Sequence, residues 1–185
     1  MMNVEQAMQQ RHSVRAFLPR TVDAVLVRDL LAQAGQAASG GNLQPWRVIA
    51  LTGDSLQALR QAMPEATPDS DAALVYPAQL WEPYRSRRFD NGEDLYRSLG
   101  IGREDRSGRQ QQLARNTHMF GAPVGVFIAV DSRMLHAQWV DLGIYLQSLM
   151  LLATGKGLAT CAQGFWRSYS DFVSRHLALP QGYQI

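Results

Sequence analysis

Apolar residues recur at helical spacing along much of the chain, and this periodicity predicts most of its helices. The expected helices cover about residues 4–10, 21–38, 53–63, 110–119, 135–154 and 170–180. Thr21 is the expected N-cap of the second helix, and Pro64 and Pro180 end the third and the last because proline cannot continue a helix. The helix at 135–154 is apolar nearly all round, a pattern typical of a helix at the centre of a protein.

Short apolar runs between these helices predict the strands, at Arg47 to Leu51, Val124 to Val130 and Leu158 to Cys161. The run at 124–130 is continuously apolar, as in a strand that is buried on both faces. Residues 181–185 are expected to turn into one more strand just where the sequence ends, so we expect a C-terminal strand and tail to be missing. Strands that alternate with long helices predict an α/β or α+β class.

The segment at about residues 64–108 differs in composition from the rest of the chain. Prolines and glycines interrupt any regular period there, so the sequence predicts no helix or strand. A connection of this length is usually either disordered or devoted to a binding site. Its aromatic residues argue against complete disorder. We therefore expect an excursion from a single domain that spans residues 1–185.

Composition and charge narrow the function classes. With 46% apolar and 18% charged residues the chain is expected to be globular, and a net charge of +2 with scattered arginines does not indicate a nucleic-acid partner. Cys161 is the one cysteine, which excludes internal disulfides, and the histidines lack metal-ligand spacing, so we expect no metal. The sequence shows neither a secretory signal nor an apolar run long enough to span a bilayer, so we expect a cytoplasmic protein with no membrane partner.

Two segments in the first quarter of the chain carry candidate binding chemistry. Arg11-His12-Ser13-Val14-Arg15 places two guanidinium groups and a hydroxyl where they can grip a phosphate, with a solvated basic turn as the alternative. The segment Ser39 to Trp46 has two consecutive glycines and the amide side chains of Asn42 and Gln44, which suit close approach to a flat ring with polar edges. The alternative is a helix-to-strand loop that uses glycine for its turn alone.

A third segment, Gly157 to Phe165, is expected to be a strand that leads into a glycine-containing turn with backbone amides facing a ligand. We interpret Cys161 as a small buried hydrophobic residue rather than a nucleophile, because no local signature ties a histidine to it. The sequence contains no Gly-x-Gly-x-x-Gly, no P-loop and no Gly-x-Ser-x-Gly. Their absence excludes a Rossmann dinucleotide loop, a P-loop and a nucleophile elbow.

Together with Asn116, Phe120-Gly121-Ala122-Pro123-Val124 and Asp141-Leu142-Gly143, these segments resemble the FMN-dependent nitroreductase family. The resemblance spans roughly Arg11 to Phe165. It implies an α+β fold, a three-layer α/β sandwich with a central, mostly antiparallel sheet flanked by helices. It also implies an intertwined homodimer, because in this family each FMN lies at the interface between two subunits.

The resemblance further implies which residues bind FMN. They are Arg11, His12, Ser13, Arg15, Ser39, Gly40, Gly41, Asn42, Gln44, Asn116, Ala162, Gln163 and Gly164. The group at 11–15 would hold the phosphate and ribityl end, and the group at 39–44 would arrive from the other subunit. Residues 162–164 match a turn whose backbone faces flavin N5, and Asn116 or its neighbour Arg115 would approach the pyrimidine edge. No side chain is expected to act as a catalytic acid or base.

The implied activity is hydride transfer from NADH or NADPH through flavin N5 to nitroaromatic, quinone or related small-molecule acceptors, in alternating half-reactions. The alternatives are another flavin reaction on the same scaffold (dehalogenation, enone reduction or flavin fragmentation) and a non-catalytic flavin-binding protein. Glu82-Pro83-Tyr84-Arg85 and Arg87-Arg88 are similar to a branch that contains nitroaromatic and nitrobenzoate reductases. If Arg85, Arg87 or Arg88 faced the flavin, an anionic acceptor such as a nitrobenzoate would be favoured; placement on the surface is the alternative for each.

Overall fold

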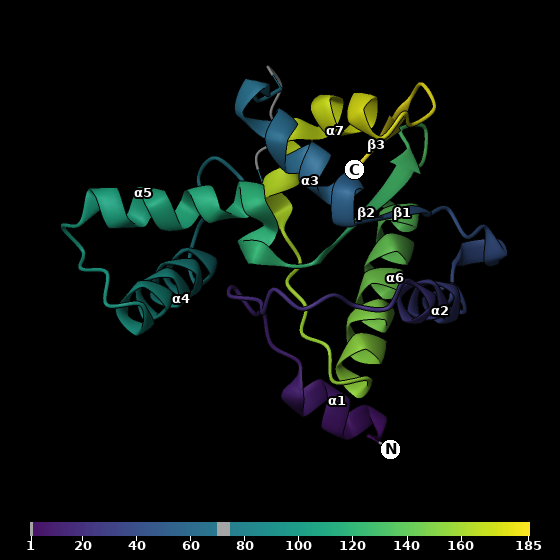
Figure 1. Ribbon diagram of the computed structural model, residues 1–185, viewed down its shortest axis with the longest axis horizontal. Coiled ribbons are helices and arrows are strands. Elements are labelled where there is room, and N and C mark those ends of the chain that lie inside the picture. The colour runs from purple at the N-terminus through teal and green to yellow at the C-terminus, as the bar shows by residue number, and fades with distance from the viewer. Residues whose placement is uncertain (1, 70–74) are drawn as a thin grey trace.

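The computed structural model describes residues 2–69 and 75–185 (Figure 1). Its helices are α1 Val4–Gln10, α2 Ala24–Ala34, α3 Gly53–Ala62, α4 Tyr84–Ser98, α5 Arg106–Ala114, α6 His136–Gly155 and α7 Ser170–His176. The strands are β1 Arg47–Thr52, β2 Val124–Asp131 and β3 Tyr183–Gln184. Short 3-10 helices cover Gly40–Asn42, Met63–Glu65, Arg115–Gly121 and Gly164–Tyr169.

The three strands form a small antiparallel sheet in the order β1-β2-β3. In the first ladder Ile49 lies opposite Phe127, and in the second Asp131 lies opposite Tyr183. The antiparallel pairing agrees with the α+β class expected from the resemblance. The strand expected after Pro180 is confirmed as β3.

One face of the sheet packs against α3 and α7, which lie at the top of Figure 1. Because side chains alternate along a strand, Ile49 and Leu51 of β1 point to the same face as Phe127 of β2. The Phe127 ring meets the ring of Trp166 edge to face, with centroids 5.4 Å apart. The buried members of this core are Leu51, Leu56, Leu59, Met63, Met119, Ala122, Phe127, Trp166 and Val173.

The long helix α6 extends below the sheet in Figure 1 and packs against α1 and α2. Tyr145 at its middle is 1% exposed, and its hydroxyl donates to the carbonyl of Leu31 in α2 at 3.0 Å. Its ring centroid lies 5.0 Å from that of Trp46, just before β1. By contrast, Val140 on the same helix is 64% exposed. The predicted apolar helix is therefore confirmed, but one chain covers only part of its surface.

The second helix starts and ends inside its predicted range. Asp23 rather than Thr21 caps α2, because the Asp23 carboxylate accepts the N–H of Val25 at 2.8 Å. The helix ends at Ala34, and the N–H of Gly35 then bonds the carbonyls of its last turn. The prediction of a helix that runs to about Ala38 was therefore wrong at both ends.

The predicted strand at 158–161 is also wrong. One isolated parallel bridge joins Thr160 to Ser13, and the Val14 N–H donates to the Thr160 carbonyl at 3.0 Å. The apolar run is extended, but its pairing with the Ser13 segment stops after this bridge. Apolar composition alone does not show over how many residues a predicted strand will pair with a neighbouring segment.

The excursion contains regular structure that its sequence does not predict. It holds all of α4 and the first turn of α5, which begins at Arg106 rather than Gln110, and Figure 1 shows both helices projecting from the rest of the protein. None of the residues of α4 is buried. The helix therefore lacks the regularly spaced apolar residues by which a helix is predicted from sequence. Residues 70–74 of the excursion lie outside the described residues.

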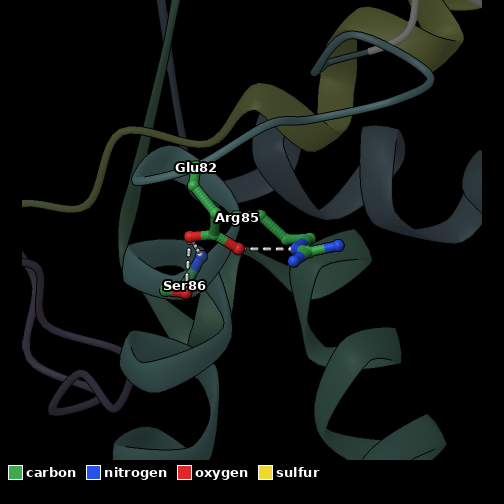
Figure 2. Close-up of polar contacts among 3 residues, drawn as sticks. All are labelled: Glu82, Arg85 and Ser86. Carbon is green, nitrogen blue, oxygen red and sulfur yellow. Dashed lines mark hydrogen bonds and ion pairs between the residues drawn. The ribbon is translucent and has the colours of Figure 1, made fainter.

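Polar side chains fix these two helices where burial does not. The Glu82 carboxylate accepts from Arg85 Nε at 2.7 Å, and from the hydroxyl and backbone N–H of Ser86 at 2.6 and 3.3 Å, at the start of α4 (Figure 2). Glu93 of α4 and Arg109 of α5 form a two-point ion pair at 2.6 and 3.0 Å. Within the described part of the chain, no helix is long and apolar enough to cross a membrane.

Candidate functional site

A cleft of about 560 Å³ opens between the excursion and the body of the protein. Its walls come from four parts of the chain: Arg15, residues 75–78 with Arg88, residues around Asn116 and Phe120, and residues 161–168. These parts are far apart in sequence, and two of them belong to the segments singled out above. The cleft is therefore the candidate functional site.

Arg15 is held at the cleft by backbone pairing on both sides of it. Before it, the N–H of Val14 donates to the Thr160 carbonyl at 3.0 Å; after it, the N–H of Phe17 donates to the Phe120 carbonyl at 3.3 Å. The side chain is half-buried, yet it makes no hydrogen bond or ion pair with any residue in 2–69 or 75–185. A half-buried guanidinium with free N–H groups is suited to bind an anion.

The turn at residues 162–164 is fixed through the side chain of Gln163. Its Nε2 donates to the carbonyl and to the side-chain oxygen of Asn116, at 3.2 and 2.9 Å, and its Oε1 accepts from Trp166 Nε1 at 3.4 Å. Asn116 Nδ2 is engaged in turn with the Leu113 carbonyl at 2.8 Å. Asn116 thus acts on the cleft by orienting Gln163, because its own amide groups are already used.

The backbone of this turn is left open to a ligand. Among the described residues, the N–H groups of Ala162, Gln163 and Gly164 donate to no acceptor. A Cβ at Gly164 would lie 2.9 Å from Cγ1 of Val75, so a side chain at residue 164 would have to displace the Val75 side chain. The turn therefore carries three neighbouring N–H groups without an acceptor among the described residues, in a segment that lines the cleft.

Cys161 lies between this turn and the arginines. Burial raises the pKa of its thiol, and the charges of Arg15 and Arg11 oppose that rise. The net direction is upward, so the thiol stays protonated and is no activated nucleophile. This agrees with the expectation that Cys161 is no nucleophile, but the residue is only partly buried and lines the cleft, so the prediction of a buried cysteine was wrong.

Arg11 and His12 open onto a smaller hollow of about 220 Å³, next to the bridge between Ser13 and Thr160. The ring Nδ1 of His12 lies 2.9 Å from the Gln10 carbonyl. Arg11 and Arg15 thus face neighbouring hollows rather than one, with the Ser13 segment between them.

The segment at 39–44 lies apart from both hollows. Its 3-10 turn is anchored to α6, where the buried Asp141 accepts the Gly40 N–H at 3.2 and 3.3 Å. Gln44 donates its N–H to Ser39 Oγ at 3.0 Å and its amide to Asn42 Oδ1 at 2.9 Å. Gly41 has φ of 58°, a left-handed conformation in which glycine is free of strain.

One chain therefore brings Arg15, Asn116 and 162–164 together, places Arg11, His12 and Ser13 beside them, and keeps Ser39, Gly40, Gly41, Asn42 and Gln44 away. Asp141, which holds that last group, entered the sequence analysis only as part of a motif. Its signal is a carboxylate in a nearly all-apolar helix.

The excursion contributes one wall of the cleft, and of the three arginines that the sequence analysis raised there, Arg88 is the one that lines it. The guanidinium carbon of Arg88 lies 4.4 Å from the centroid of the Tyr76 ring, and both residues line the cleft. Arg85 is engaged with Glu82 at the start of α4 instead, and neither it nor Arg87 lines the cleft.

Comparisons with known proteins agree with this geometry. The model of the Nitroreductase family matches residues 8–185. The chain is 35% identical over 177 residues to a 4-nitrobenzoate reductase of Pseudomonas putida, covering 95% of this chain and 78% of the relative. It is 34% identical over 182 residues to a nitrobenzene nitroreductase of Ectopseudomonas oleovorans, covering 96% and 80%.

Solved structures resemble the chain over nearly its whole length. The FMN and NADPH-dependent nitroreductase NfnB of Sphigopyxis sp. strain HMH superposes with a TM-score of 0.93 and 40% identity, covering 99% of this chain and 84% of that one. The FMN-dependent NfnB of Mycobacterium smegmatis, solved in complex with NADPH, gives 0.84 and 30%, covering 97% and 82%.

Proposed function

The chain belongs to the nitroreductase family, and from that premise we propose that it binds FMN and reduces aromatic nitro compounds with electrons from NADH or NADPH. The observation that carries the proposal is the cleft at residues 161–164, where three N–H groups and the half-buried Arg15 side chain have no partner among residues 2–69 and 75–185. Donors and positive charge in this arrangement favour a flavin ring that gains negative charge on reduction.

The residues present fit this cofactor. Arg15 in the cleft offers charge-assisted hydrogen bonds to a phosphate, and Arg11 offers them from the neighbouring hollow. The turn at 162–164 lines the cleft and offers backbone N–H groups that donate to no acceptor among the described residues. When bound, FMN supplies the hydride chemistry, which no side chain of the cleft provides. The protein binds and orients the cofactor and stabilises the negative charge that it gains on reduction.

We also propose that the working form is a homodimer. Ser39 to Gln44 are predicted to contact the cofactor, yet within one chain they are fixed to α6 and away from the cleft. The same helix leaves apolar surface uncovered, with Val140 64% and Ile144 38% exposed. A second copy packed along α6 would cover this surface and bring its own 39–44 segment to the cleft.

Purified protein mixed with FMN tests the proposal. We expect the protein to retain flavin absorbance through gel filtration, NADPH to bleach it, and a nitroarene to restore it. Oxidation of NADPH that depends on the nitroarene then separates a reductase from a non-catalytic flavin-binding protein. Protein that takes up no FMN would overturn the proposal. Elution as a monomer with FMN bound would overturn the dimer alone.

A further inference from the structure

Two arginines from different parts of the chain line the cleft. Arg15 comes from the segment beside Thr160, whereas Arg88 comes from α4 of the excursion. Among the described residues that line the cleft there is no aspartate or glutamate. The cleft thus carries two arginines, one from the body of the protein and one from the excursion, whereas Arg11 opens onto the neighbouring hollow.

Three arginines lie within a few residues of one another on α4, and their surroundings separate them. Arg85 donates from Nε to Glu82 at 2.7 Å, and Arg87 does not line the cleft. Arg88 lines it, forms no ion pair with any residue the structure describes, and lies over the Tyr76 ring at 4.4 Å. Stacking occupies a face of the guanidinium and leaves its N–H groups at the edge free to bind an anion in two-point fashion.

The remainder of the wall is suited to an aromatic ligand. Tyr76, Phe120 and Phe165 all line the cleft, and aromatic side chains favour flat aromatic partners in stacked or edge-to-face contact. A ligand that satisfies both features has an aromatic ring with an anionic group at one end.

We propose that Arg88 binds the carboxylate of a nitroaromatic acid, so that the acceptor reduced in this cleft is an anion. The inference rests on the proposed function, since it names the acceptor of that reaction. Arg15 and Arg11 remain for the phosphate of the cofactor, and Arg88 recognises the acceptor from the excursion. The nicotinamide cofactor carries phosphates too, so the experiment separates these anions.

The decisive measurement is a ratio of two acceptors on one enzyme preparation. We compare kcat/KM for 4-nitrobenzoate with kcat/KM for 4-nitrobenzamide, its neutral counterpart of nearly the same shape. Arg88→Gln should lower this ratio about tenfold or more, because it removes a charge-assisted, two-point contact. Partial loss of folding or of FMN lowers both rates together and leaves the ratio unchanged. Arg87→Gln is the matched control, as it removes the same charge from the same helix outside the cleft.

Binding without turnover gives a second readout. Benzoate cannot be reduced at a nitro group, so its dissociation constant can be measured from the change it causes in flavin absorbance. We expect Arg88→Gln to weaken benzoate about tenfold and to leave the FMN dissociation constant and the KM ratio of NADPH to NADH unchanged.

The remaining outcomes each reject something definite. An unchanged acceptor ratio in Arg88→Gln overturns the inference and leaves the reductase proposal standing. Weakened FMN, or a selective rise in KM for NADPH, together with an unchanged acceptor ratio, assigns Arg88 to those phosphates and overturns its role in acceptor binding. A wild-type protein that reduces neither nitroarene overturns the proposed function itself.

Discussion

The amide nitrogen of Gln163 donates to both the carbonyl and the side-chain oxygen of Asn116, at 3.2 and 2.9 Å. This pair joins the 3-10 helix at Arg115–Gly121 to the turn at 162–164, which lines the cleft. Both side chains are half-buried, so neither is free to exchange its partner for water without cost. The geometry of the cleft floor therefore depends on a contact between two residues distant in sequence.

Replacement of Asn116 by alanine should loosen this floor. We expect a loss of about 1 to 2 kcal/mol in the free energy of unfolding, because the hydrogen bonds of the Asn116 side chain with Gln163 and with the Leu113 carbonyl both disappear. FMN affinity should fall as well, since residues 162–164 are then less well ordered. Urea unfolding and FMN titration measure the two effects. Gln111→Ala, an exposed change on α5, is the control and should stay within about 0.5 kcal/mol of wild type. Unchanged FMN binding in Asn116→Ala would show that the pair does not position the turn.

Arg15→Ala should weaken FMN retention more than any surface change. A charge-assisted hydrogen bond is worth about 1.5 to 3 kcal/mol, which corresponds to roughly a tenfold or greater rise in the dissociation constant. The difference between wild type and variant should shrink at high salt, because part of the contact is coulombic. Arg20→Ala removes an equal charge from an exposed position and serves as the comparison. Equal retention by the two variants would remove Arg15 from the cofactor site.

The sequence predicts those elements whose burial leaves a periodic trace. The sequence correctly predicts the helix α6 and the strand β2 because their apolar residues pack in the core or against a neighbouring helix. The helix α4 is missed because none of its residues is buried and its contacts are polar, such as those of Glu82 with Ser86 and of Glu93 with Arg109, which leave no periodic pattern.

The residues of the candidate site also differ in whether the sequence alone predicts them. Arg15 and Gly164 are found from local motifs, since glycine and paired arginines are informative at short range. Arg88 is not separable from Arg85 and Arg87 in sequence, because a run of charges does not reveal which member turns toward a cleft. The separation comes from Glu82, which engages Arg85, and from the ring of Tyr76 under Arg88.

Gly164→Ala tests how closely the excursion covers the turn. The added methyl would lie 2.9 Å from Cγ1 of Val75 and must displace it. Val75 is 47% exposed and can move, so the loss of stability should stay near the lower end of the 1 to 3 kcal/mol typical of overpacking. Acceptor KM should rise because the wall at 75–78 is pushed from the cleft. The double variant with Val75→Ala should recover much of this change; if it does not, the methyl acts on the ligand rather than on Val75.

Low pH should destabilise the helices α4 and α5 of the excursion by protonating Glu93. The hydrogen bonds and charge of Arg109 hold the pKa of Glu93 below its ordinary value of 4.5. A carboxylate whose folded pKa is depressed stabilises the fold fully above its unfolded pKa, and this contribution is lost as pH falls through the lowered folded value. Hydrogen exchange across α4 and α5 should therefore be slow at pH 6 and accelerate below about pH 4.5, after correction for the intrinsic effect of pH on exchange. Glu93→Gln should exchange quickly at pH 6 already and lose this acid-dependent step, whereas Asp90→Asn on the same helix should keep it. An acid step of wild-type size in Glu93→Gln would assign the transition to another carboxylate.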